Sequence, residues 1–200
     1  MPFVRETIWN QPRARLGWPQ ALATLFLLGL GWVAQRSGWL PLQVGFLRGF
    51  GAALTLQMVG AIWFGIWGIL AGSIALFLPG ISTPTYPLPE PLAQLPAYLC
   101  QGLLVSWAFR HFRADPRLRT NRDWAIWTFW GVLLSNALGG ALVALSQGLL
   151  AELPKASWKL LFLHWWASNT ISVWFLGTVL LKFLSPLIVR SPAFCSRYLR

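Results

Sequence analysis

The sequence predicts an all-α integral membrane protein with six transmembrane helices and both termini in the cytoplasm. The 200 residues are 56% hydrophobic and only 10% charged, whereas a soluble domain usually carries about 25% charged residues. Most of the Lys and Arg residues fall in the two termini and in one loop, Arg110–Arg122. Long apolar runs separate these basic segments, so the net charge of +11 indicates membrane topology rather than nucleic-acid binding.

The apolar runs give the six spans in order. A helix needs about 20 residues to cross the hydrocarbon core. The run Val44–Pro79 would make one helix of about 54 Å, so we expect two spans that divide near Gly60. The expected spans are 19–35, the two halves of 44–79, 92–109, 124–150 and 160–189. Residues 1–18 and 190–200 then form a basic N-terminal segment and a tail, on either side of one membrane domain, 19–189.

The distribution of basic residues selects six spans over five. Cytoplasmic loops of membrane proteins are enriched in Lys and Arg. Six spans place eleven basic residues inside, three outside (Arg36, Lys155 and Lys159) and two within spans (Arg48 and Lys182). Five spans would put the N-terminus and the basic loop on opposite sides. The pattern therefore predicts a multi-pass protein of a bacterial cytoplasmic (inner) membrane.

Two features of the spans and loops have alternative interpretations. Small residues recur every four positions, as at Gly68/Gly72 and Gly131/Ser135/Gly139, which permits close helix packing either within the bundle or against a partner. The proline-rich segment Gly80–Pro91 is expected to be a non-helical connector or a lid.

Lys182 lies within the last expected span, and its charged group is expected to extend toward the cytoplasmic side.

Residues that would support catalysis are missing. None of the five acidic residues lies deep in an expected span, although ion-coupled carriers usually need a buried carboxylate. The sequence has no GxxxxGK[ST] and no HExxH motif, and its two cysteines form no metal-binding pattern. His164 has no recognisable serine partner of an intramembrane protease. We therefore expect a protein that is not an enzyme and has no cofactor and no metal site.

Polar residues in the outer half of the bundle form the candidate binding site, because polar groups in lipid are costly. Gln94, Tyr98 and Gln101 share one face of a helix. An aromatic pocket with amides and one arginine would suit a small planar or carboxylated ligand. The predicted substrate-binding residues are Arg48, Gln94, Tyr98, Gln101, His164, Trp165, Trp166 and Asn169.

Each of these residues also has a purely structural interpretation. Arg48 would reach the outer interface with its charged group, Trp165 and Trp166 would belong to the interfacial aromatic belt, and His164 would form an interhelical hydrogen bond. Asn136, deeper in its span, is expected to hold two helices together.

The chain resembles the substrate-binding S components of energy-coupling factor transporters, and its pattern is similar to that of the membrane sensor domain MASE1. The resemblance lies in Arg48-Gly49, in the segment WFGIWGILAG from Trp63, in HWWASN from His164, and in Pro186. It implies a subunit that binds a vitamin-like molecule from outside and docks on an integral membrane T component, which is coupled to cytosolic ATPases. The first span lacks the Ala-x-x-x-Ala pair associated with docking, and the N-terminus lacks the histidine motif of the metal-specific members.

The sequence therefore leads to one functional hypothesis and two rivals. The first is a substrate-binding subunit of an energy-coupled importer for a vitamin-like small organic molecule. The rivals are a non-catalytic subunit or assembly factor of a larger membrane complex, and a membrane sensor domain. All three place the protein in a lipid bilayer, and none involves nucleic acid.

Overall fold

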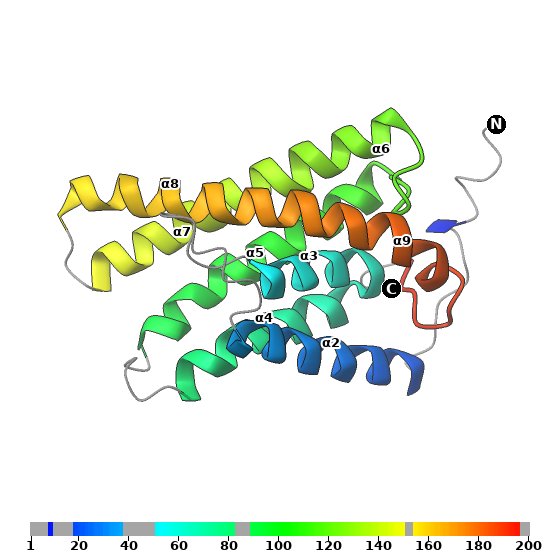
Figure 1. The fold of residues 1–200 in the computed structure, drawn as a ribbon, viewed down its shortest axis with the longest axis horizontal. Coiled ribbons are helices and arrows are strands. Elements are labelled where there is room, and N and C mark those ends of the chain that lie inside the picture. The colour runs from blue at the N-terminus through cyan, green and yellow to red at the C-terminus, as the bar shows by residue number, and fades with distance from the viewer. Residues whose placement is uncertain (1–7, 10–17, 38–50, 83–88, 151–153, 197–200) are drawn as a thin grey trace.

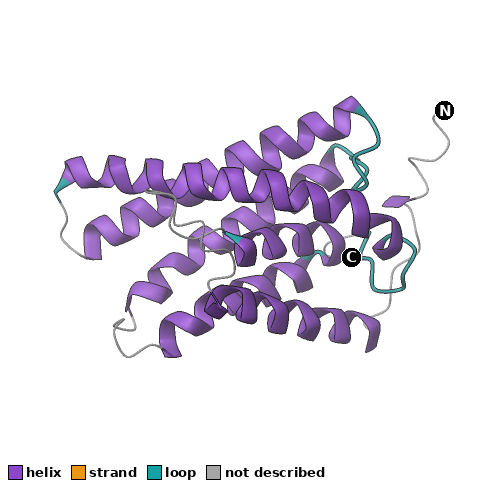
Figure 2. Ribbon diagram, viewed as in Figure 1, coloured by secondary structure: helices purple, strands orange, loops and turns teal. Residues whose placement is uncertain are grey.

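The structure is a bundle of helices, as expected. The computed structural model describes residues 8–9, 18–37, 51–82, 89–150 and 154–196, and none of these residues lies in a strand (Figure 2). The helices are α2 (Trp18–Ser37), α3 (Ala52–Phe64), α4 (Ile66–Ser82), α5 (Pro89–His111), α6 (Asn121–Ile126), α7 (Ser135–Leu150), α8 (Lys155–Ser172) and α9 (Thr178–Ile188), with π-helical segments η1 (Trp127–Leu134) and η2 (Val173–Gly177).

The described helices join into six rods that pass up and down the bundle. Four rods are the single helices α2, α3, α4 and α5. The other two are continuous composites, α6–η1–α7 and α8–η2–α9, whose helices α7 and α8 lie side by side (Figure 1). Both the segment that contains Trp9 and the segment that contains Cys195 contact the end of the bundle that carries Arg110–Arg122. We call this end the basic end and the opposite one the far end.

Three of the rods are long and apolar enough to cross a membrane. They are Leu92–His111, Asn121–Leu150 and Ser157–Ile188, and they match the last three expected spans. The remaining apolar stretches, Trp18–Ala34, Ala52–Phe64 and Ile66–Leu78, are shorter. The structure therefore has the helices that the sequence predicts, with three of them long enough to span a bilayer by themselves.

Helix α3 forms the centre of the bundle. Twelve of its 13 residues are buried, and it packs against α2, α4, α5, α8, η2 and α9. A helix of 13 residues is about 20 Å long, well short of the hydrocarbon core of about 30 Å. Because α3 is buried on all sides, its environment is protein rather than lipid.

The division of the run Val44–Pro79 at Gly60 was wrong, because the break between the two helices is at Gly65. Gly65 has φ of 58° and ψ of −131°, and its N–H donates to the carbonyl of Ala61. A side chain is strained at such a φ. Gly60 serves helix packing instead, since a Cβ on the facing Gly68 would lie 2.1 Å from the Gly60 carbonyl oxygen.

The segment Gly80–Pro91 is helical at both of its ends, which corrects the expectation of a non-helical connector there. Helix α4 continues to Ser82, and α5 begins at Pro89. Proline is tolerated in the first turn of a helix because the N–H that it lacks would have no intrahelical partner. The residues between these two helices, 83–88, lie outside the described part.

The small residues that recur every four positions pack inside the bundle wherever the structure describes them. A Cβ on Gly72 would lie 2.3 Å from Cγ of Gln57, and one on Gly139 would lie 2.4 Å from Cδ of Gln101. Gly131 and Gly177 both lie against the indole of Trp127. These glycines therefore allow large side chains of neighbouring helices to approach the backbone. Gly45 and Gly49 lie outside the described residues.

Both π-helical segments lie next to Trp127, which is completely buried. This tryptophan begins η1, and its Nε1 donates to Oγ1 of Thr178 at 3.0 Å, directly after η2. A π-helical turn widens the backbone locally. The two widened turns and their glycines thus surround one large indole and join the two composite rods.

Arg110 holds the basic end together. Its guanidinium donates to the carbonyls of Ile62 (3.3 Å) and Cys195 (2.8 Å) and to the hydroxyl of Ser106. The Ser106 hydroxyl in turn donates to the carbonyl of Ala61 at 2.7 Å. These bonds satisfy carbonyl groups at the C-terminus of α3, where a positive charge is favourable.

Two carboxylates hold the basic loop in a fixed conformation, Asp115 within the loop and Asp123 at the start of α6. Asp115 accepts from Nε and Nη2 of Arg117, with the closest contact at 2.8 Å. Asp123 accepts from the backbone N–H and the hydroxyl of Thr120, which caps α6. Lys182 extends from α9 to this loop, as the sequence predicts, and donates to the carbonyl of Leu118 at 2.9 Å.

Gly65→Ala is expected to destabilise the bundle by about 1–3 kcal/mol, the usual cost of holding a side chain in such a sparsely populated backbone conformation. The measurement is the thermal unfolding midpoint in a mild detergent. Gly29→Ala is the control, because nothing lies within 4 Å of a Cβ at that exposed position of α2. Equal midpoints for both variants would contradict the assigned role of Gly65.

Candidate functional site

The predicted site residues of α5 form hydrogen bonds within the protein. The hydroxyl of Tyr98 donates to Oε1 of Gln94 at 2.6 Å, one helical turn away. Nε2 of Gln101 donates to Oδ1 of Asn136 on α7 at 3.0 Å, and this pair joins two helices as expected for Asn136. Gln101 and Asn136 are both completely buried.

The predicted residues of α8 divide between the bundle interior and its surface. Nδ2 of Asn169 donates to the carbonyl of Trp165 at 2.9 Å, and Oδ1 of Asn169 lies against Gly51. Trp166 stacks on Phe162 and donates to the carbonyl of Leu133 at 3.3 Å. His164 and Trp166 together line a surface groove of about 400 Å³, whose other walls are Leu160, Leu163 and Ala167.

The predicted residues therefore occupy three places rather than one shared pocket. One is the α5–α7 contact around Gln101, the second is the start of α3 near Asn169, and the third is the surface groove beside His164. Arg48 lies outside the described residues. Helical spacing predicts which residues share a face, but not which neighbouring helix covers that face.

A cluster of buried polar groups lies in the middle of the bundle. Gln57 of α3 donates through Nε2 to Oγ of Ser73 on α4 at 2.8 Å and to the carbonyl of Tyr98 on α5 at 2.7 Å. Gln101 lies within one turn of Tyr98 and faces α7. We call this group the central amide cluster, and its members are Gln57, Ser73, Tyr98, Gln101 and Asn136.

Besides Ser73, Gln57 is the member that the sequence analysis missed. It is 1% exposed and stands in the otherwise apolar segment AALTLQMVGAIWF of α3. A glutamine in the middle of such a segment is itself a signal, because intramembrane polar groups are costly and usually have a function. Its partners could not be predicted without knowing that α4 and α5 both pack against α3.

Two acceptors of the central amide cluster have no partner among the described residues. They are Oε1 of Gln57 and Oε1 of Gln101, both fully buried. An unpartnered buried polar atom costs about 1–3 kcal/mol. Each of these two oxygens can therefore still accept a hydrogen bond from an N–H or O–H donor.

The charge around the central amide cluster is low. The described carboxylates with known contacts, Asp115 and Asp123, both belong to the loop at the basic end. Among the described residues, no group of three or more His, Cys, Asp or Glu side chains is placed to hold a metal ion.

Cys195 lies at the basic end, and its environment shifts the pKa of its thiol. Burial raises the pKa of the Cys195 thiol above its usual value, and the nearby charge of Arg110 lowers it in part. The thiol is consequently protonated at neutral pH, which makes it a poor nucleophile.

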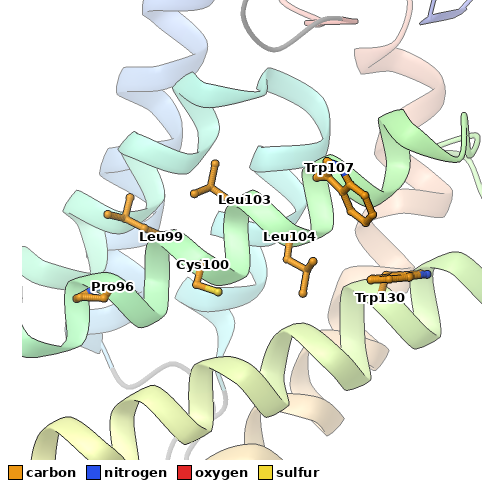
Figure 3. Close-up of a pocket in the computed structure, with 7 residues that line it drawn as sticks. All are labelled: Pro96, Leu99, Cys100, Leu103, Leu104, Trp107 and Trp130. Carbon is orange, nitrogen blue, oxygen red and sulfur yellow. The ribbon is translucent and has the colours of Figure 1, made fainter.

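A larger, apolar groove runs along the outside of α5. Its volume is about 790 Å³, and Trp130 of η1 faces the α5 side chains across it (Figure 3). The α5 residues that line it are Pro96, Leu99, Cys100, Leu103, Leu104 and Trp107. We call it the α5–η1 groove.

No known protein family, curated protein or solved structure matches this chain. The function therefore has to be inferred from the residues and their geometry.

We expect the Gln101–Asn136 pair to show strong coupling in a double-mutant cycle. Gln101→Leu or Asn136→Leu alone leaves a buried amide without its partner, at a cost of about 1–3 kcal/mol, whereas replacing both removes the two polar groups together. The double variant should therefore lose less stability than the sum of the single losses, by about 1–2 kcal/mol. Unfolding in detergent measures the cycle, and additive losses would show that this hydrogen bond contributes little.

Proposed function

We propose that the protein is a small-molecule-binding integral membrane subunit that acts through separate partner proteins and has no catalytic centre of its own. The observation that supports this proposal best is the pair of buried, unpartnered amide oxygens on Gln57 and Gln101. Buried polar groups in a membrane bundle are retained mainly where they serve a ligand or a transport path.

The chemistry of the cluster favours a neutral ligand with hydrogen-bond donors. Both unpartnered atoms are carbonyl oxygens, so the ligand has to supply N–H or O–H groups. A carboxylate on the ligand would need a cationic side chain in the site. The predicted cationic residue, Arg48, is not among the described residues. The proposed contacts are therefore Gln57 and Gln101, with an uncharged polar part of the ligand.

The membrane arrangement is part of the proposal. The chain would cross a bacterial cytoplasmic membrane six times, with the basic end inside. Three apolar rods long enough to span a bilayer support this arrangement, as does the concentration of arginines at one end of the bundle. The resemblance to S components makes an importer that contains a T component and cytosolic ATPases the first expectation.

A membrane sensor is the second candidate, and one observation favours it. The helices that carry Gln57 and Gln101, α3 and α5, are also joined at the basic end by Ser106 and Arg110, whose side chains bind the last carbonyls of α3. A ligand that separates α3 from α5 in the middle of the bundle would therefore displace the basic loop. A partner enzyme that contacts this loop would detect that displacement.

The first test is native mass spectrometry of the protein purified from its own membranes in a mild detergent. The proposal predicts a bound small organic molecule. Gln57→Met and Gln101→Met, which keep the side-chain volume nearly constant but remove the acceptor, should each weaken its retention by about tenfold. Gln147→Met is the matched control, because Gln147 is a half-buried amide on α7 outside the cluster.

The outcome also separates the rival functions. A ligand whose uptake into cells requires this protein supports the importer, and a ligand that changes only the activity of a co-purified enzyme supports the sensor. A ligand-free chain that co-purifies with stoichiometric membrane proteins of another kind would replace the proposal with a structural subunit of a membrane complex.

The six-span topology has its own test in reporter fusions. Green fluorescent protein fused after residue 200 should fluoresce, because the C-terminus is expected to be cytoplasmic. Alkaline phosphatase inserted within 83–88 should be active, because that segment is expected to be outside, where its disulfides form. An active phosphatase inserted at Arg119 in the basic loop would contradict the orientation.

A further inference from the structure

The α5–η1 groove has the shape and polarity of a site for a hydrocarbon chain. Six α5 side chains form one wall, and Trp130 of η1 stands opposite (Figure 3). Every lining residue is apolar except for the thiol of Cys100. The groove lies on the outside of α5, away from the central amide cluster, so it is independent of the ligand proposed above.

The length of the groove matches one leaflet of a bilayer. From Pro96 to Trp107, α5 advances 11 residues, which is about 16 Å along the helix axis. Half of the hydrocarbon core is about 15 Å thick. The groove is therefore about as long as one leaflet of the hydrocarbon core is deep, a length that one acyl chain can fill.

The end of the groove nearest the basic loop is a cluster of aromatic rings. Trp107 is 5.4 Å from Trp130 and 4.7 Å from the stacked ring of His111, between ring centroids. Phe112 lies 5.5 Å from Trp130. Tryptophan favours the boundary between hydrocarbon and headgroups, so this cluster marks the level at which a lipid headgroup would begin.

Positive charge adjoins this aromatic end. Arg122 is exposed and donates through Nη2 to the carbonyl of Phe112 at 2.8 Å, which places it at the ring cluster. Arg113 follows Phe112 in the chain and is also exposed. The loop's ion pairs, from Asp115 to Arg117 and Arg119, involve neither Arg113 nor Arg122. Arg122 therefore brings a positive charge to the aromatic end of the groove, and the exposed Arg113, next to Phe112 in the chain, adds to the positive charge of this part of the loop.

We propose that the α5–η1 groove binds an anionic phospholipid, with one acyl chain along α5 and the headgroup phosphate at Arg113 and Arg122. The charge complementarity favours this occupant over a zwitterionic lipid, because two arginines attract a net negative headgroup.

The test uses the full chain, stripped of lipid in a neutral detergent and titrated with phosphatidylglycerol or with phosphatidylcholine of the same acyl chains. Native mass spectrometry counts the bound lipids, and the thermal midpoint reports stabilisation. Phosphatidylglycerol should bind more tightly and raise the midpoint more. Arg113→Gln and Arg122→Gln should each weaken its binding by about fivefold, and leave phosphatidylcholine binding unchanged.

The controls separate this site from general attraction to a basic protein. Arg190→Gln removes an exposed arginine that follows α9 at the same end, and it should leave phosphatidylglycerol affinity unchanged. Leu104→Trp should fill the groove and abolish tight binding, whereas Leu187→Trp, at a 67% exposed position of α9, should not. Phosphatidylglycerol with chains of eight carbons should bind more weakly than the sixteen-carbon lipid, a result that needs no variant.

Three results would overturn the proposal. One is equal affinity for the two headgroups. Another is an equal loss for Arg190→Gln and for the two groove arginines, which would indicate an unlocalised charge effect. The third is a protein carrying Leu104→Trp that folds, as shown by its unchanged helical content, and still binds phosphatidylglycerol with full affinity.

Discussion

The burial of α3 on all sides is the constraint on which the rest of the structure depends. Because α3 contacts protein around its whole circumference, the side-chain NH₂ group of Gln57 and the last carbonyls of α3 are bonded by neighbouring helices, whereas Oε1 of Gln57 has no partner among the described residues. Gln57 donates to Ser73 on α4 and to a backbone carbonyl of α5. Ser106 and Arg110 donate to the last carbonyls of α3. The same few bonds therefore place α4 and α5 around α3 and position the central amide cluster.

Much of the fold could be predicted from the sequence, because it follows from one-dimensional patterns. Apolar runs and the positions of arginines are sufficient to predict the helical class and the ranges of the last three rods. The break at Gly65 was placed five residues too early, because Gly60 and Gly65 look alike in sequence and only their backbone angles and neighbours distinguish a turn from a packing position. The prolines of Pro89–Pro91 were assigned to a connector because their tolerance at a helix start depends on where the helix begins.

The candidate site was predicted less well, for a physical reason. The position of a residue along its expected span identifies polar residues at a similar depth, and it grouped Gln101 with His164 and Asn169. Separation around the bundle axis depends on which helices are neighbours, and the structure places His164 at a surface groove while Gln101 is bonded to α7. Gln57 was missed although a lone amide in an apolar run is a signal, and its partners on two other helices could not be predicted without knowing how the helices pack.

The turn at Gly65 has a consequence for how the chain enters a membrane. A single residue separates α3 from α4, so neither helix has a loop that would let it move independently of the other. Helix α3 is short, and its glutamine would be exposed to hydrocarbon if it were inserted alone. In the proposed membrane arrangement the two helices would therefore leave the insertion machinery together as a hairpin, with α4 already shielding Gln57 through Ser73.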